Sequence, residues 1–388
     1  MAKKQKTTKS EKQQMNQTTT KSDSDDYLLK MSYYEGRSYK LQMIPATFFT
    51  AFVIMITRMY TYNRDMSQFF WTNQSENLTD FFSHYKLVAI VICAIVALLM
   101  LLFRFITQSL YIVRSKYYIP ALVYVVFVLL SLAFSKYHNF AWFGANDRFD
   151  GTLAILCYFV LFFYIINTIN SRTSLKWLLY PLCASVILLS LLGLTQALDV
   201  DFFRTTLGQK LLVPNVATED GGTTWALIDQ AKQNGELFLK FTFQNKEIYQ
   251  TVYNINYVSY YLTLLVPLFA FLFLRENSIP KKVFWGFMEL CVMFNILGAS
   301  SSGGLVGLAV AFFVTIFVFN KTLLKWWKNL IVLFVIIAIA AIPTASHWIP
   351  DIASGLGVEN PFSKDMPKSA SEEGATASAD NADTAKSG

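Results

Sequence analysis

Nine long apolar runs separated by polar segments dominate the pattern of the chain. An apolar helix of roughly 20 residues crosses the hydrocarbon core of a bilayer, and the runs are about that long. They lack the alternation of apolar and polar residues that a transmembrane β-barrel needs. The sequence therefore predicts an all-α polytopic membrane protein with about nine transmembrane helices, at residues 41–59, 86–106, 118–135, 151–169, 178–198, 257–274, 284–300, 304–320 and 329–345.

Lys and Arg residues between the runs predict the orientation, because short cytoplasmic loops are enriched in them. If the N-terminus is cytoplasmic, the short inside loops hold eleven Lys and Arg residues and the short outside loops hold five. We therefore expect the N-terminus inside and the C-terminus outside.

The two ends of the chain are polar. Residues 1–40 are basic and predict a disordered cytoplasmic tail. Residues 346–388 are rich in Ala, Ser, Asp and Glu, and predict a disordered extracytoplasmic tail or a truncated continuation. The polytopic membrane domain would then extend over 41–345.

The longest loop, 199–256, lies outside on this topology. It contains turn signals and a period-2 pattern over Leu239–Phe243 and again over Ile248–Tyr253. Such a pattern predicts a β-hairpin. A loop of this length often has structure and function of its own, so we expect a small extracytoplasmic subdomain there.

Composition narrows the class of protein. Only 15% of residues are charged, against about 25% in soluble domains, and 54% are hydrophobic. A soluble protein is therefore excluded, as is disorder in the middle of the chain. The four cysteines all lie inside apolar runs, which excludes a disulfide-stapled secreted fold. No His/Cys cluster has metal-ligand spacing in the outside loops, so we expect no metal and no cofactor.

A short aromatic segment joins the third and fourth runs and carries Arg148 between Asp147 and Asp150. One interpretation is an interfacial aromatic belt with an Asp–Arg pair. The other is a cation that binds an anionic headgroup, with a carboxylate or His138 nearby as base.

Two further outside segments have unusual composition. Asn254 and Asn256, flanked by Tyr253 and Tyr257, precede the sixth run, where a helix cap is the simplest interpretation. Residues 300–304, of sequence Ser-Ser-Ser-Gly-Gly, join the seventh and eighth runs, where small residues favour a tight turn and close helix packing.

Together these three motifs resemble the O-antigen ligase and polymerase family of membrane glycosyltransferases, in its Gram-positive branch. The resemblance covers roughly 85–340. Ser302 stands where the family often has Arg, and Ile255 where it usually has Pro. The motifs are Trp142-Phe143-Gly144-x-x-x-Arg148-x-x-Gly151, Tyr253-Asn254-Ile255-Asn256-Tyr257 and Ser301-Ser302-Gly303-Gly304-Leu305-Val306-Gly307.

The resemblance implies a metal-independent glycosyltransferase of the bacterial cytoplasmic membrane. Its donor would be a glycan linked to a lipid diphosphate of the undecaprenyl type, and its acceptor another glycan or a lipid on the outer face. Membrane lipids surround such a protein, and nucleic acid is not a partner. Ligase and polymerase share these motifs, so the sequence leaves that choice open.

The resemblance also implies roles for individual residues. Arg148 would meet the charge of the diphosphate, because Arg binds phosphate bidentately and keeps its proton. Asp147, Asp150, His138 and His347 are candidate bases for the acceptor hydroxyl. The candidate substrate-binding residues, which would hydrogen-bond or stack on sugars, are Trp142, Tyr253, Asn254, Asn256, Tyr257 and Ser302.

Other functions remain open. Ser302 and the abrupt C-terminus fit an inactive or truncated relative of the family. A transporter or flippase for lipid-linked glycans would carry ionisable groups inside its spans, and Glu289 is the clearest such group here.

Overall fold

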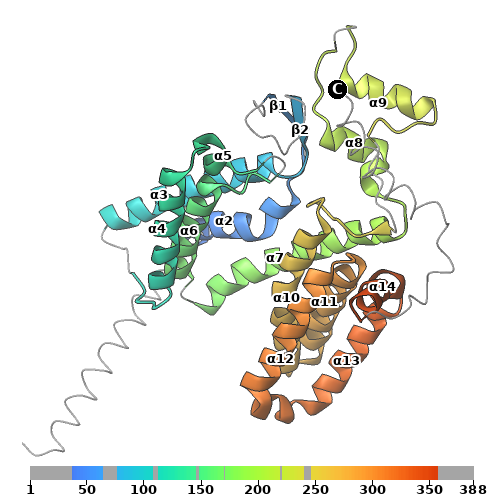
Figure 1. Cartoon of the computed structure of the whole chain (residues 1–388). Helices are drawn as coiled ribbons and strands as arrows, with labels where there is room; N and C mark the ends of the chain where they lie inside the picture. The colour runs from blue at the N-terminus through green and yellow to red at the C-terminus, as the bar shows by residue number, and fades with distance from the viewer. Residues whose placement is uncertain are drawn as a thin grey trace, which may run out of the picture. The chain divides into compact units, whose positions relative to one another are not determined.

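The computed structural model describes residues 37–63, 77–107, 112–145, 148–169, 171–218, 221–239 and 246–356 (Figure 1). Over these residues the chain is all-α apart from one short hairpin. It divides into two compact units. Unit 1 comprises Met1–Ser185 with Leu211–Trp225, and unit 2 comprises Val186–Lys210 with Ala226–Gly388.

Unit 1 is built on helices that pack around α3 and α6. Tyr164 and Leu161 on α6 and Ala97 on α3 are fully buried in its core. The Tyr164 hydroxyl donates to the backbone carbonyl of Gln42, which joins α2 to this core. The elements are α2 (Arg37–Thr47), η1 (Phe48–Phe52), η2 (Val53–Met55), β1 (Tyr60–Asn63), β2 (Asn77–Asp80), α3 (His84–Ile106), α4 (Tyr118–Phe134), α5 (His138–Phe143), α6 (Thr152–Thr168) and the first part of α7 (Arg172–Ala197).

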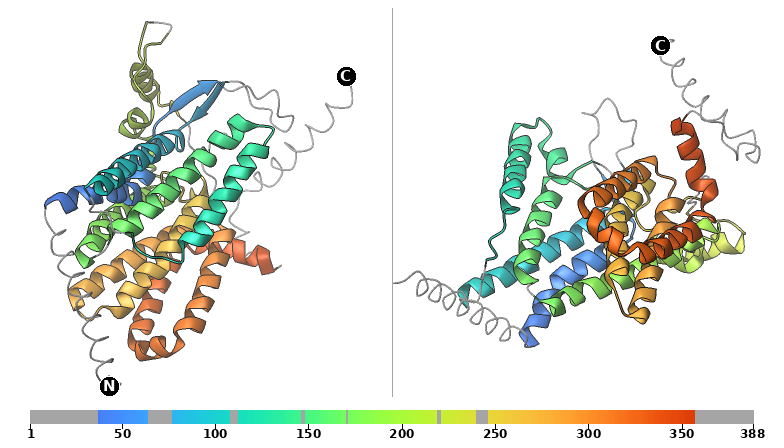
Figure 2. Two further views of the ribbon diagram at one scale, coloured as in Figure 1. Left: turned by 90° about the vertical axis from the view of Figure 1, so that its left-hand side faces the viewer. Right: turned by 90° about the horizontal axis from the view of Figure 1, so that it is seen from below.

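Unit 2 is a bundle in which α11 packs against α10, α13 and α14, as Figures 1 and 2 show. Phe269 on α10 stacks on Trp285 of α11 with ring centroids 6.2 Å apart. The elements are the rest of α7, η3 (Phe202–Arg204), most of α8 (Thr206–Leu212) and of α9 (Thr224–Gln233), α10 (Ile255–Arg275), α11 (Ile279–Gly298), α12 (Ser302–Lys325), α13 (Trp327–Ala341) and α14 (Ala345–Leu356).

The predicted helices are present. Each of the nine apolar runs coincides with a helical segment, which confirms the all-α class. Three of these helices, α3, α7 and α10, are long and apolar enough to cross a membrane. Shorter apolar helices include α4, α6 and α13.

The predicted hairpin in the long loop is wrong in its second strand. Residues Ile248–Tyr253 form a turn, because Gln250 and Tyr253 have positive φ angles of 48° and 66°. The backbone N–H groups of Tyr249 and Gln250 donate to the Gln196 side chain and not to a neighbouring strand. Most of the first predicted strand, Leu239–Phe243, lies outside the described residues, which omit 240–245. The long loop instead contains the helical segments η3, α8 and α9.

The hairpin that does form lies earlier in the chain. β1 pairs antiparallel with β2, with Tyr62 opposite Leu78. It follows the first apolar run, and Figure 2 shows it as a pair of blue arrows.

The predicted disordered tail is wrong at its beginning. Residues 346–356 belong to α14, where Trp348 donates its indole N–H to the carbonyl of Ala341 at 3.0 Å. Ala353 on the same helix is buried. This anchoring explains why the segment is helical, since isolated short helices are marginal in water. The tail after 356 and residues 1–36 lie outside the described residues.

Candidate functional site

The first motif, in unit 1, is a loop closed by two glycines. A Cβ atom on Gly151 would lie 2.3 Å from the backbone nitrogen of Gly144. A Cβ on Gly144 would lie 2.5 Å from the backbone nitrogen of Asp150, and Gly144 has a φ of +93°. Only glycine fits these positions. The Thr152 hydroxyl adds a 3.0 Å hydrogen bond to the carbonyl of Ala141.

Phe149 anchors this loop. Its side chain is buried although its φ is +53°, and its ring contacts those of Tyr62 and His84 with centroids 5.5 and 5.2 Å away. The residues on either side, Arg148 and Asp150, are exposed. The loop therefore exposes a cation, Arg148, just before the buried Phe149 and a carboxylate, Asp150, just after it.

The other candidates of the first motif lie nearby in the chain. His138 is exposed at the first residue of α5, and Trp142 is half-buried on the same helix. Asp147 lies outside the described residues. All of these candidates belong to unit 1.

The second and third motifs meet in unit 2. The Asn254 side chain caps α10 by accepting a 2.9 Å hydrogen bond from the backbone N–H of Asn256. The Asn256 side-chain oxygen accepts a 2.8 Å hydrogen bond from the hydroxyl of Ser301, which is buried. Tyr253 and Tyr257, on either side, are exposed. The cap predicted from sequence is present, and it is linked to a motif 45 residues away.

The glycines of the third motif let α12 start against α10. A Cβ on Gly304 would lie 2.4 Å from Cβ of Ser259, and one on Gly303 would lie 3.0 Å from the Tyr260 hydroxyl. Ser302 is exposed at the first residue of α12. The close packing predicted for these small residues is therefore present.

His347 reaches the same end of unit 2. The Ser300 hydroxyl donates to the His347 carbonyl at 3.0 Å. Nδ1 of His347 is buried and has no hydrogen-bond partner among the described residues. Burial lowers the pKa of the His347 imidazole, and the nearby charge of Lys246 lowers the pKa further. The ring is therefore neutral at neutral pH and can accept a proton.

Buried amides hold the segment that leads into the second motif. The Gln196 side chain accepts from the N–H groups of Tyr249 and Gln250, at 3.1 and 2.7 Å, and donates to the Gln250 carbonyl. The Gln250 side chain donates to Asn295 at 2.9 Å. These residues are almost fully buried. Nothing in their spacing along the sequence indicated this network.

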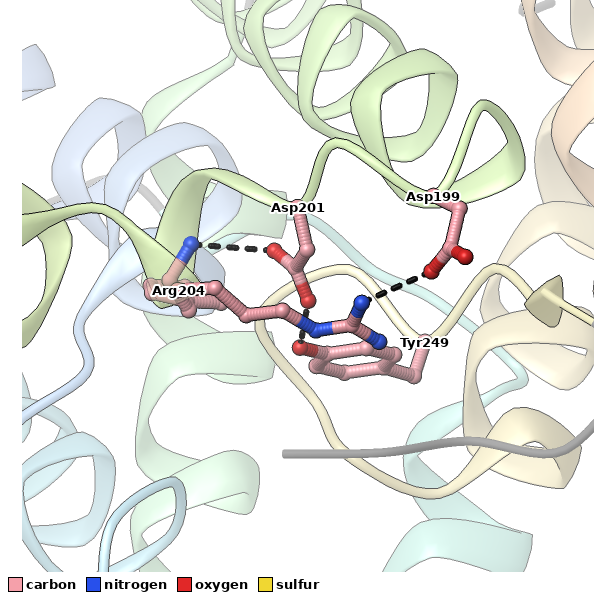
Figure 3. A network of polar contacts seen from close by, with 5 residues as sticks. Asp199, Asp201, Arg204 and Tyr249 are labelled. Atoms are coloured by element: carbon pink, nitrogen blue, oxygen red, sulfur yellow. Dashed lines mark hydrogen bonds and ion pairs between the residues drawn. The ribbon is translucent and has the colours of Figure 1, made fainter. Parts of the chain in front are cut away.

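The long loop also contains an Asp-x-Asp sequence, Asp199-Val200-Asp201, a pattern not expected in the outside loops. Such a pair often binds a metal, but here each carboxylate is engaged (Figure 3). Asp199 pairs with Arg204 at 2.7 Å. Asp201 accepts from the Phe203 N–H at 2.9 Å and from the Tyr249 hydroxyl. Burial, together with the Asp201 carboxylate, raises the pKa of Tyr249. Asp199 and Asp201 therefore hold the loop in shape, and Arg204 supplies the positive charge beside Asp199 that a metal ion would otherwise supply.

Strained backbone conformations occur in the segments that connect the helices. Among the described residues, six that are not glycine have positive φ, and all lie in segments that the predicted topology puts outside. They are Phe149, Asp199, Lys246, Gln250, Tyr253 and Ser300. Each such residue costs on the order of 1 kcal/mol or more, and strain of this kind clusters at functional sites. The strained residues therefore favour the outside segments as the location of a functional site.

Over the described residues, no group of three or more His, Cys, Asp or Glu side chains is arranged to hold a metal ion. Comparison of the chain with protein-family models, with curated protein sequences and with solved structures finds no match in any of the three.

Proposed function

We propose that this chain is an integral membrane glycan ligase or polymerase with nine spans and a cytoplasmic N-terminus. It transfers a glycan from a lipid-diphosphate donor to a glycan or lipid acceptor on the outer face of the bacterial cytoplasmic membrane. The observation that carries the proposal is the hydrogen bond between Asn256 and Ser301, which joins two of the three motifs in one unit.

The residues have distinct roles in this reaction. The bond between the anomeric carbon and the diphosphate oxygen breaks, and the negative charge on the leaving group is met by the exposed guanidinium of Arg148. The acceptor hydroxyl attacks the anomeric carbon and gives its proton to a base. The candidate bases are Asp147, Asp150 and His138 in the same unit as Arg148, and His347 in unit 2, whose imidazole is kept neutral by burial. The rings of Tyr253 and Tyr257 stack on the sugars, and the Asn254 amide hydrogen-bonds to them.

The test uses a host whose surface glycan depends on this gene. Ser301→Ala removes the hydroxyl that joins the two motifs, and Asn256→Ala removes its acceptor. Both variants should reduce attached or long glycan on a gel at equal protein level. Asn277→Ala, at an exposed position between α10 and α11, is the matched control and should behave as wild type. Wild-type glycan in both Ser301→Ala and Asn256→Ala would contradict the proposal.

One observation favours a second function, transport of the lipid-linked glycan. Glu289 on α11 is fully buried, and ionisable groups inside membrane helices are typical of transporters. A transporter would move the donor in vesicles without forming a new glycosidic bond. Product analysis therefore separates the two functions.

A further inference from the structure

Glu289 is the most deeply buried acid in the described part of unit 2. Its side chain has no exposed surface, and neither carboxyl oxygen has a hydrogen-bond partner among the described residues. It lies beside the backbone of Ala270 on α10, without an acceptable hydrogen-bond geometry. Val292 and Met293, one turn along α11, are also buried.

Apart from Asp351 in the middle of α14, the charged residues on the surrounding helices lie within about one turn of a helix end. On α11 itself the nearest is Lys282, seven positions earlier, or roughly 10 Å along the helix axis. The part of α7 in this unit carries no charged residue. The titratable residues on the helices packed against α11 are Tyr257, Tyr260, Tyr261 and Arg275 on α10, Lys321 and Lys325 on α12, Lys328 on α13, and His347 and Asp351 on α14; α11 adds Lys281 and Cys291.

This arrangement decides the charge of Glu289. An ionised carboxylate without a partner is costly to bury, whereas a neutral acid is far cheaper. The group must therefore hold a proton in this structure. A purely structural acid would also donate that proton to a neighbour, because an unsatisfied buried group costs about 1–3 kcal/mol. Glu289 has no such neighbour among the described residues.

We propose that Glu289 is a proton-binding site in the interior of unit 2. Its carboxyl group holds a proton in the closed arrangement and exchanges it when the surrounding helices part and admit water. This goes beyond the proposed glycosyl transfer, whose residues all lie in the segments expected to face outside.

Infrared spectroscopy of the purified chain in lipid tests this directly. A protonated carboxylic acid gives a C=O stretching band that an ionised carboxylate lacks, and comparison with a Glu289 variant assigns that band to Glu289. We expect the band in wild type and its absence in Glu289→Gln, which keeps the size of the side chain. Glu236→Gln, at an exposed position, is the matched control and should keep the band.

Transfer to D2O tests exchange. The Glu289 band should move to lower frequency as deuterium replaces the proton. Absence of the acid band in wild type would overturn the proposal, since the carboxyl would then be ionised. A band that does not move in D2O would overturn it as well, because the proton would be locked in place. Neither result depends on glycan transfer, so failure here is distinct from failure of the proposed function.

Discussion

At the scale of single residues, glycines and buried polar groups determine the shape of the candidate site. Gly144 and Gly151 bring two stretches of backbone into direct contact, and this places Phe149 in its aromatic pocket. The sequence showed both glycines as part of a motif. It did not show the reason for them, because their contact depends on how the loop between them turns, including the positive φ of Gly144.

Gly151→Ala should therefore destabilise unit 1. The added methyl group would meet backbone atoms, which cannot move aside as a flexible side chain can, and overpacking costs about 1–3 kcal/mol. Thermal unfolding in detergent measures the effect. Gly222→Ala is the control, because its methyl group would lie 3.2 Å from one flexible hydroxyl. Equal unfolding temperatures for the two variants would show that the loop is not closed as described.

The stability of the protein should also depend on His347 in a defined direction. Its pKa is lower in the folded state than the ordinary value of about 6.5, so the unfolded state binds more protons as the pH falls. Stability is therefore fully present above about pH 6.5 and is lost as the pH falls through the folded pKa. The unfolding temperature of His347→Asn should fall less than that of wild type between about pH 8 and pH 5. A larger fall in the variant would contradict the assigned burial.

At the scale of elements, the helices were predictable and their connections were not. Apolar runs such as 86–106 identified helices because lipid and packed interiors both demand continuous apolar surface. The turn at Ile248–Tyr253 resembled a strand by its period-2 pattern. The segment does not pair as a strand, because the side chain of Gln196 accepts the hydrogen bond from the backbone N–H of Tyr249, 53 residues away. In a sheet, a carbonyl of the neighbouring strand would accept such a hydrogen bond. The Asn256–Ser301 link was likewise hidden, although both residues belonged to predicted motifs.

The packing of α12 on α10 predicts that one substitution destabilises the protein and that a second substitution, at the residue it contacts, restores stability. Gly304→Ala would place a Cβ 2.4 Å from that of Ser259 and should cost about 1–3 kcal/mol of unfolding free energy. Ser259→Gly should recover most of the loss in the double variant, because it removes the atoms that clash. Denaturant or thermal unfolding of the four proteins measures the coupling. Additive effects would mean that these two positions do not touch.

At the scale of the whole molecule, the proposed topology puts the site segments on one side of the membrane. Lys136→Cys, before α5, should react with a membrane-impermeant thiol reagent added to intact cells. Ser278→Cys, at the start of α11, should react only after the membrane is opened. Both positions lie outside the apolar runs, and Ser278 is exposed. Labelling of Ser278→Cys in intact cells would reverse the orientation or change the number of spans.

The central claim is that Arg148 meets the diphosphate of a lipid-linked donor. The most direct measurement is a gel of cell-surface glycans from a host lacking this gene, carrying wild type, Arg148→Ala or Arg58→Ala. Arg58 is an exposed arginine outside the motif and serves as the matched control. We predict that wild type and Arg58→Ala restore long or attached glycan, and that Arg148→Ala reduces it by roughly 100-fold or more, as loss of a charge-stabilising donor does. Full restoration by Arg148→Ala at equal protein level would contradict the claim.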